Sequence, residues 1–234
     1  PEPFAEFGES WARRFLPAVP FYIESMALWQ DIQIVLGKDL EVTQEGGLVV
    51  AANDLEMRTI EAKAKLERSV GLEMELLTAG ELRDRAPYIS KTMIGGALCA
   101  IEGKANSLIA APSFAAAARD LGATLLKGQR VIGIQRNRAG FQIQTDDLSL
   151  EATHIVNTAG LEAGVIAAML GYKIDVQSFP IQLSVTEPVA PLFRHLVYSG
   201  SEMLTLKQTG KGTILIGGGW PSALDSQRQP QVTS

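Results

Sequence analysis

Residues 122–160 of this chain read GATLLKGQRVIGIQRNRAGFQIQTDDLSLEATHIVNTAG, and this stretch decides the fold. Its short apolar runs alternate, contain many β-branched residues and are separated by Gly, Asn and Asp, a pattern typical of β-strands joined by turns. The stretch predicts a strand at residues 125–126, an antiparallel meander that begins at Val131, and a return strand over residues 154–158.

The predicted return strand ends at a junction of small residues that leads directly into a predicted helix. It finishes in Asn157-Thr158-Ala159-Gly160, and a helical pattern over residues 161–170 begins at once. A strand that runs into a helix over small residues leaves free backbone N–H groups at the helix start, where the helix dipole is positive. Such a junction suits a phosphate group, although most junctions of this kind serve packing alone.

The composition limits the classes of protein to consider. The 234 residues are 46% hydrophobic, which is enough for a buried core, and the net charge of -5 argues against nucleic acid as a partner. No apolar run is long enough to span a membrane, and no signal peptide opens the sequence. Cys99 is the single cysteine, so a reducing, cytoplasmic location is expected. The abrupt start at Pro1 indicates a piece of a longer protein.

Helical spacing dominates the first part of the chain. Residues 1–18 are expected to form a loop with a short helix. Residues 19–36 predict a long helix with Gly37 as its C-terminal cap. Its apolar stripe is expected to lie in the core and consists of Tyr22, Met26, Trp29 and Leu36.

Two further stretches predict strands. Residues 40–52 predict a β-hairpin, because an alternating segment and an apolar run flank the turn Glu45-Gly46-Gly47. Residues 93–100 predict a strand in which the pair Gly95-Gly96 indicates a bulge or the close approach of another group. Cys99 in this strand is expected to be a small buried side chain.

Capping signals locate two helices between these strands. Asn53 or Asp54 is expected to cap a helix over residues 55–70, with Ile60, Ala64 and Leu66 facing inward. Thr78 and Glu81 have the spacing of a capping box, which predicts a short helix after Thr78.

The remaining elements follow from the same rules. The sequence predicts, in chain order, a helix at residues 112–121, a long strand at 174–187, a connection at 191–198 and a hairpin of strands at 203–208 and 213–218. The two histidines do not indicate a metal site, because His154 is expected to be structural and His195 to be exposed.

This succession of elements resembles the D-amino-acid oxidase family of FAD-dependent oxidoreductases, which includes glycine oxidase, sarcosine oxidase and related amine dehydrogenases. The resemblance rests on co-linear order over roughly residues 19–222 rather than on one specific motif. The stretches that carry it are the meander with its NTAG ending, EGKANSLIAAPSFAAAARDLGATLLKGQRVIGI, DVQSFPIQLSVTEP and KQTGKGTILIGGGWP.

The resemblance implies an α+β (α/β) fold with two parts. One is a partial FAD-binding domain of the glutathione-reductase type, and the other is a substrate domain with a mainly antiparallel sheet and flanking helices. The implied segments are a helical segment at 1–38, the substrate domain at 39–102 and 173–222, the partial FAD-binding domain at 103–172, and a tail at 223–234.

The resemblance also implies a cofactor, FAD, and its contacts. Val131 matches a position whose backbone meets the adenine, Thr158, Ala159 and Gly160 match the turn near the diphosphate, and Leu161 follows them. Family members transfer a hydride from substrate to flavin N5, so no catalytic acid, base or metal is implied. The family's G-x-G-x-x-G motif and its glycine-rich closing segment are absent from these 234 residues. We therefore expect the segment alone to bind FAD weakly or not at all, and to be inactive.

Substrate contacts are expected on the late strands. The family's oxidases bind the substrate carboxylate with an arginine, whose two parallel N–H donors suit that group. This sequence has Lys207-Gln208-Thr209 at the matching place, so Gln208 and Lys207, with Tyr198 nearby, are the expected substrate-binding residues. The departure looks closer to the amine and proline-like dehydrogenase branch.

Two functions remain open from the sequence. The first is an oxidoreductase that oxidises the C–N bond of a D-amino acid, glycine, sarcosine or a proline-like amine. It would pass electrons to oxygen, a quinone or a partner subunit, in a homo- or hetero-oligomer. The alternative is a non-catalytic interaction or scaffold subunit derived from the same family.

Overall fold

A computed structural model describes residues 2–177, 179–226 and 230–231 of the chain. Two compact units are present: Pro1–Ala117 together with Ile181–Ser234, and Ala118–Pro180. The predicted α+β class with a mainly antiparallel sheet is confirmed. The predicted domain segments stay a prediction, and part of the predicted tail lies outside the described residues.

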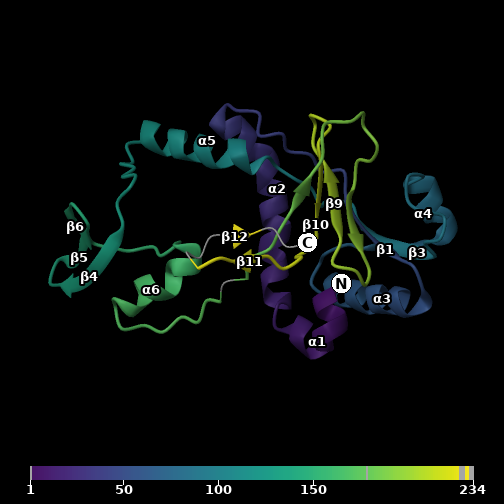
Figure 1. Cartoon of the computed structure of the whole chain (residues 1–234), viewed down its shortest axis with the longest axis horizontal. Coiled ribbons are helices and arrows are strands. Elements are labelled where there is room, and N and C mark those ends of the chain that lie inside the picture. The colour runs from purple at the N-terminus through teal and green to yellow at the C-terminus, as the bar shows by residue number, and fades with distance from the viewer. Residues whose placement is uncertain (1, 178, 227–229, 232–234) are drawn as a thin grey trace. The chain divides into compact units, whose positions relative to one another are not determined.

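A seven-stranded sheet lies in the larger unit, in the order β2-β3-β1-β8-β9-β10-β7. Figure 1 labels its strands β1, β3, β9 and β10. Its neighbours pair antiparallel except for β1 and β8, which are parallel. The strands are β1 Gly47–Ala51, β2 Glu75–Thr78, β3 Gly95–Cys99, β7 Ser184–Val185, β8 Leu196–Ser199, β9 Thr205–Gln208 and β10 Ile214–Gly217, and β11 Ala223–Leu224 with β12 Pro230–Gln231 forms a separate pair.

Helices cover both faces of this sheet. Side chains alternate along β1, so Val49 packs on one face with Ile60 of α3, while Leu48 packs on the other face near Leu82 of α4. The helices are α1 Glu2–Arg13, α2 Val19–Leu36, α3 Asp54–Arg68, α4 Ala79–Arg85 and α5 Ser107–Asp120, with a 3-10 turn at Leu16–Ala18.

Local capping signals placed three of these helices correctly. α2 ends at Gly37, which adopts a left-handed φ of 57° as predicted. The Asn53 side chain caps α3, and Thr78 and Glu81 form the expected capping box on α4. Ile60, Ala64 and Leu66 face inward, as predicted.

Close contacts with the neighbouring strands β1 and β2 explain the glycine pair in β3. A Cβ at Gly96 would overlap the carbonyl oxygen of Val49 in β1, and one at Gly95 would lie 2.7 Å from the carbonyl oxygen of Leu77 in β2. The predicted close approach is therefore confirmed, and the approaching groups are the neighbouring strands.

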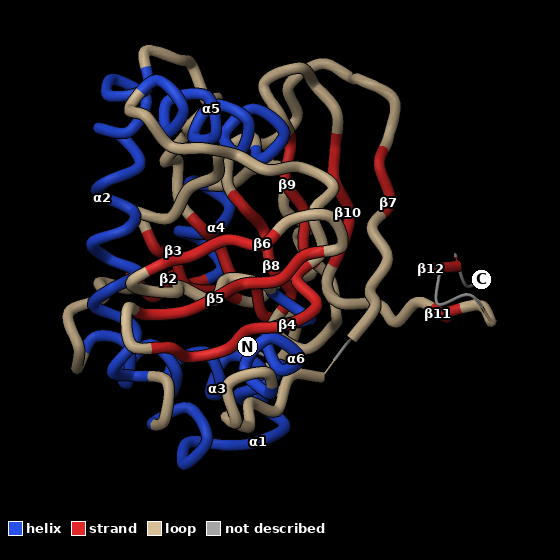
Figure 2. Tube along the Cα trace, turned by 90° about the vertical axis from the view of Figure 1, so that its left-hand side faces the viewer, coloured by secondary structure: helices blue, strands red, loops and turns tan. Residues whose placement is uncertain are grey.

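The smaller unit contains the predicted meander (Figure 2), formed by β4 Val131–Asn137, β5 Gly140–Thr145 and β6 Ser149–Ala152. A 3-10 turn at Gly160–Glu162 leads into α6 Ala163–Ala168. The predicted strands at 125–126 and 154–158 are wrong. A strand requires a hydrogen-bonded neighbour, and neither segment pairs with another strand in the described part of the chain.

Three predictions for the larger unit's strands are also wrong. Residues 40–52 do not form a hairpin, because both edges of β1 are bonded to β3 and β8, and Thr43 instead bridges Lys104. The strand expected at 174–187 is reduced to β7 and a bridge from Ile181 to Pro221. The connection expected at 191–198 overlaps β8 at residues 196–198. In addition, α1 replaces much of the loop expected at residues 1–18 and is broken at Gly8.

Candidate functional site

A pocket of about 330 Å³ lies on one face of the seven-stranded sheet, where β8, β9 and β10 are roofed by residues 102–105. We call it the Tyr198 pocket. Its polar lining consists of Glu102, Lys104, Tyr198, Thr205 and Lys207, and its apolar lining includes Leu183, Leu196 and Leu215.

Strand register brings three of these side chains to the same face. Tyr198 in β8 stands opposite Thr205 in β9, and Lys207 in β9 stands opposite Leu215 in β10. Because side chains alternate along a strand, Thr205 and Lys207 point to the same side. Of the predicted substrate-binding residues, the fold therefore places Tyr198 and Lys207 in one pocket.

The roof is fixed by a backbone bridge. The N–H of Thr43 donates to the carbonyl of Lys104 at 2.9 Å, and the N–H of Lys104 donates to the carbonyl of Thr43 at 2.8 Å. A Cβ at Gly103 would overlap the carbonyl oxygen of Thr43, so this approach needs glycine. The bridge sets where the side chain of Lys104 enters the pocket.

Glu102 and Tyr198 form a hydrogen-bonded pair in the pocket wall. The Tyr198 hydroxyl donates to Oε1 of Glu102. Burial raises the pKa of the Glu102 carboxyl, opposed by the hydrogen bond from Tyr198 and by Lys63. Burial and then the nearby Glu102 raise the pKa of the Tyr198 phenol well above its ordinary range, so the phenol is a hydrogen-bond donor at neutral pH.

Lys104 and Lys207 supply positive charge to the same pocket. Burial lowers the pKa of Lys104, Glu45 opposes this shift, and the neighbouring charge of Lys207 adds to it. The Nζ of Lys104 donates to the carbonyl of Arg194 at 3.5 Å. Within the described part of the chain, Glu102, Lys104 and Lys207 take part in no ion pair.

Gln208 lies on the opposite face from Lys207 and is buried. Its Oε1 accepts hydrogen bonds from the N–H groups of Leu192 at 2.7 Å and Phe193 at 3.3 Å. Its Nε2 donates to the carbonyls of Ala190 and Gly212, each at 3.0 Å. The amide thus holds the segment before β8, and a substrate contact by Gln208 stays a prediction.

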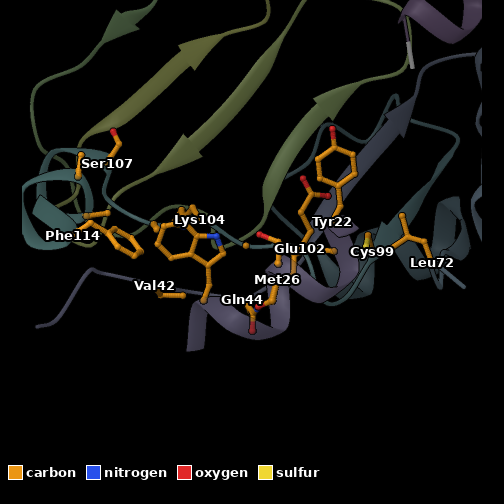
Figure 3. Close-up of a pocket in the computed structure, with 16 residues that line it drawn as sticks. Tyr22, Met26, Val42, Gln44, Leu72, Cys99, Glu102, Lys104, Ser107 and Phe114 are labelled. Atoms are coloured by element: carbon orange, nitrogen blue, oxygen red, sulfur yellow. The ribbon is translucent and has the colours of Figure 1, made fainter. Parts of the chain in front are cut away.

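A second hollow of about 660 Å³ lies beside α2 (Figure 3). Tyr22, Met26 and Trp29 line it, and Tyr22 is 64% exposed, so the prediction that this stripe lies in the core is wrong. The spacing identified the helix and its apolar side but not what that side contacts. Cys99 is buried as expected and also borders this hollow, and burial raises the pKa of its thiol.

The predicted cofactor contacts lie in the smaller unit. Thr158, Ala159 and Gly160 are exposed, and a Cβ at Gly160, where φ is 57°, would meet no atom within 4 Å. Leu161 is also exposed, and Val131 begins β4 half-buried. The bend is thus open rather than filled by side chains, which fits a ligand that lies against backbone.

Asn157 holds the shape of this bend. Its Oδ1 accepts a hydrogen bond from the N–H of Ala159 at 3.2 Å, and its Nδ2 donates to the carbonyl of Ala163 at 2.9 Å. These bonds link the end of the extended segment to the first residue of α6. The junction is therefore fixed by side-chain bonds although the predicted return strand is missing.

The expected exposure of His195 is wrong. His195 is only 3% exposed, and its Nδ1 is hydrogen-bonded to the Tyr88 hydroxyl. His195 directly precedes β8, which lies inside the sheet between β1 and β9, and this position explains the burial. Sequence reasoning also missed Glu102 and Lys104, because their place in the pocket depends on the bridge between Thr43 and Lys104.

Comparison with known proteins gives consistent matches. A family described as FAD dependent oxidoreductase matches residues 7–233. Sarcosine oxidase subunit beta of Rhodobacter capsulatus is 23% identical over 210 residues, which is 87% of this chain and 50% of that protein. The chain spans about half the length of the curated relatives it matches.

Solved structures share the fold. Glycine oxidase from Geobacillus kaustophilus matches with a TM-score of 0.75 and 19% identity, over 91% of this chain and 60% of that one. L-proline dehydrogenase from P. horikoshii matches with a TM-score of 0.73 and 24% identity, over 88% of this chain and 57% of that one. None of the helices in the described ranges is long and apolar enough to cross a membrane.

Proposed function

The chain belongs to the FAD-dependent oxidoreductase family, and from this premise we propose that it is a segment of an enzyme that oxidises the C–N bond of an amino acid or secondary amine. Candidate substrates are D-amino acids, sarcosine, glycine and proline-like amines, and the names of three similar proteins support the last three. The observation that carries the proposal is the Tyr198 pocket, which combines hydrogen-bonding and cationic groups in a volume suited to a small polar molecule.

FAD is the proposed cofactor of the whole protein. Val131 and the bend Thr158-Ala159-Gly160, followed by Leu161, are the proposed contacts, supported by the open backbone of that bend. When bound, the flavin supplies the hydride acceptor. The chain's own part is to bind and orient the substrate, for which Tyr198 and Lys207 are the proposed residues, with Gln208 as a further one. The segment alone is proposed to be inactive, because no G-x-G-x-x-G occurs within it.

The partners follow from the same premise. The proposed electron acceptor is oxygen, a quinone or a partner subunit. The proposed assembly is an oligomer of like or unlike subunits. A similar protein that is itself a subunit, sarcosine oxidase subunit beta, supports the unlike case. A cytoplasmic location is supported by the free thiol of Cys99.

The test compares two proteins. The protein expressed from its complete gene is expected to carry flavin absorbance and to reduce a dye acceptor with one or more of sarcosine, glycine, proline or D-alanine. The 234-residue chain is expected to retain little FAD after gel filtration. If the complete gene product takes up no FAD, the alternative of a non-catalytic interaction or scaffold subunit is favoured. A yellow, stoichiometric 234-residue chain would contradict the proposal that this segment binds FAD weakly.

A further inference from the structure

A second, smaller pocket lies where α1 meets α3, and we propose that it binds a small aromatic molecule with one O–H or N–H donor, such as a phenol or an indole. We call it the Trp11 pocket, and its volume is about 220 Å³. Its apolar walls include Phe4, Trp11, Phe15 and Leu66, and its polar lining includes Lys63 and Glu67. Among the residues that the structure describes, it shares no lining residue with the Tyr198 pocket. Binding there requires neither the flavin nor the proposed reaction.

Three aromatic rings form one side of the Trp11 pocket. Phe7, Trp11 and Phe15 recur every four residues at the end of α1 and in the turn after it, and neighbouring ring centroids lie 5.7 Å and 4.5 Å apart. Of these, Trp11 and Phe15 line the pocket, and the buried ring of Phe4 is the third. α1 lies beside α3 (Figure 1), which adds the buried side chain of Leu66. These walls suit a ring, because aromatic pairs gain from offset and edge-to-face contacts.

The carboxyl group of Glu67 supplies the polar contact. Lys63 and Glu67 are four residues apart on α3, and Nζ of Lys63 donates to Oε1 of Glu67. The other oxygen, Oε2, is buried and accepts no hydrogen bond from any residue that the structure describes. A buried acceptor without a donor is unfavourable, and buried polar atoms normally have a partner. A ligand that places an O–H or N–H beside Oε2 removes this deficit.

The size and charge of the Trp11 pocket favour an organic ligand over a water molecule or a cation. A single water occupies about 30 Å³ in the liquid and would fill only a small part of the pocket. A cation gains little, because Lys63 already balances the charge of Glu67. An apolar cavity of about 150 Å³ is large enough for benzene. One ring with one donor therefore matches both the apolar walls and Oε2 of Glu67.

The experiment measures binding to the 234-residue chain by NMR shift titration with two probes of similar shape. Phenol has a ring and an O–H donor, and toluene has a methyl group in place of that donor. Glu67→Met removes the acceptor and keeps the length of the side chain, whereas Glu67→Gln keeps an acceptor oxygen. Trp11→Ala removes part of the aromatic wall. Glu61→Met, which changes an exposed acidic residue of the same helix, is the matched control.

Phenol is expected to bind wild-type chain about tenfold or more tightly than toluene, because only phenol donates to Oε2 of Glu67. Glu67→Met is expected to remove this preference by weakening phenol and leaving toluene unchanged. Glu67→Gln is expected to retain phenol binding, which separates loss of the acceptor from loss of the fold. Trp11→Ala weakens both probes, and Glu61→Met changes neither. Thermal unfolding of each variant checks that the fold is retained.

The inference is wrong if phenol gives no saturable shift with wild-type chain, or if Glu67→Met leaves phenol binding unchanged. The complete gene product is expected to bind phenol at the same residues. Absence of binding there would show that the protein's own residues fill the pocket, and it would overturn the assignment of a small-molecule ligand. Dye reduction enters none of these outcomes, so the site and the proposed function stand or fail separately.

Discussion

At the scale of single residues, Gly47 controls the geometry of Glu102. A Cβ added to Gly47 would overlap Oε2 of Glu102, and Gly47 is itself buried in the centre of the sheet. Gly47→Ala is therefore expected to displace the Glu102 carboxyl from Tyr198 and to lower the free energy of unfolding by about 0.5–1.5 kcal/mol, the range for one lost hydrogen bond, because the displaced group is the end of a flexible side chain. Urea unfolding of the 234-residue chain measures this change.

Gly210→Ala is the matched control for Gly47. Gly210 lies in the turn between β9 and β10, and a Cβ there would meet no atom within 4 Å. This substitution is expected to change the free energy of unfolding by less than about 0.5 kcal/mol. Equal effects of the two substitutions would show that the space beside Glu102 is not the cause.

His195 makes the stability of the chain depend on pH. Burial, and then the charges of Arg194 and Arg85, lower the pKa of His195, while Glu45 opposes them, and Tyr88 is its hydrogen-bond partner. The folded chain therefore binds the proton less readily than the unfolded chain. The stability that this difference supplies is complete above the ordinary histidine pKa of about 6.5 and is lost as the pH falls below it.

The measurement is the free energy of unfolding of wild-type and His195→Gln chains between about pH 7.5 and pH 5.5, the range that spans the ordinary histidine pKa. Wild type is expected to lose stability on acidification more steeply than the variant, because Gln carries no titrating group. Parallel curves for the two proteins would mean that His195 does not titrate differently on folding.

At the scale of elements, the N-terminus of α3 depends on Asn53. Its Oδ1 accepts the N–H groups of Leu55 at 3.1 Å and Glu56 at 3.0 Å. Asn53→Ala removes these acceptors and is expected to lower the free energy of unfolding by about 1 kcal/mol. Asn53→Ser keeps an acceptor oxygen and is expected to retain most of that stability in the same urea experiment. A serine variant as unstable as the alanine variant would argue against the cap.

The contrast between local and long-range contacts explains which elements the sequence could predict. α2, α3 and α4 were placed by signals within a few residues of each end, such as Asn53 and the box of Thr78 and Glu81. The meander of β4, β5 and β6 was also predicted, because its partners are neighbours in sequence. Residues 154–158 have the same alternation but no strand beside them in the described chain, and β8 pairs with a strand about 150 residues earlier, at Gly47–Val50.

At the scale of the whole molecule, the pocket could be predicted only in part. Lys207 was expected because it lies where the family resemblance places a substrate contact, and Tyr198 was expected because it lies nearby in the sequence. Glu102 and Lys104 come from a segment without regular structure, and the bridge between Thr43 and Lys104 brings them over the sheet. A bridge between residues about 60 positions apart leaves no periodic signal in the sequence.

The surface of the larger unit gives the last prediction. Along α2, Phe21 is 72%, Ile34 80% and Val35 79% exposed, and Leu108 at the start of α5 is 85% exposed. Apolar exposure on this scale marks a surface that another part of a protein covers. The 234-residue chain is expected to increase the fluorescence of the dye ANS strongly, whereas the complete gene product of the proposed enzyme is expected to do so weakly.

The triple change Phe21→Gln, Ile34→Lys and Val35→Gln should lower the dye signal of the 234-residue chain. The same changes should impair flavin retention in the complete protein, because they disrupt the surface that its remaining part contacts. If the substituted complete protein keeps its flavin and its low dye signal, these three positions of α2 are a free surface and not an interface within the enzyme.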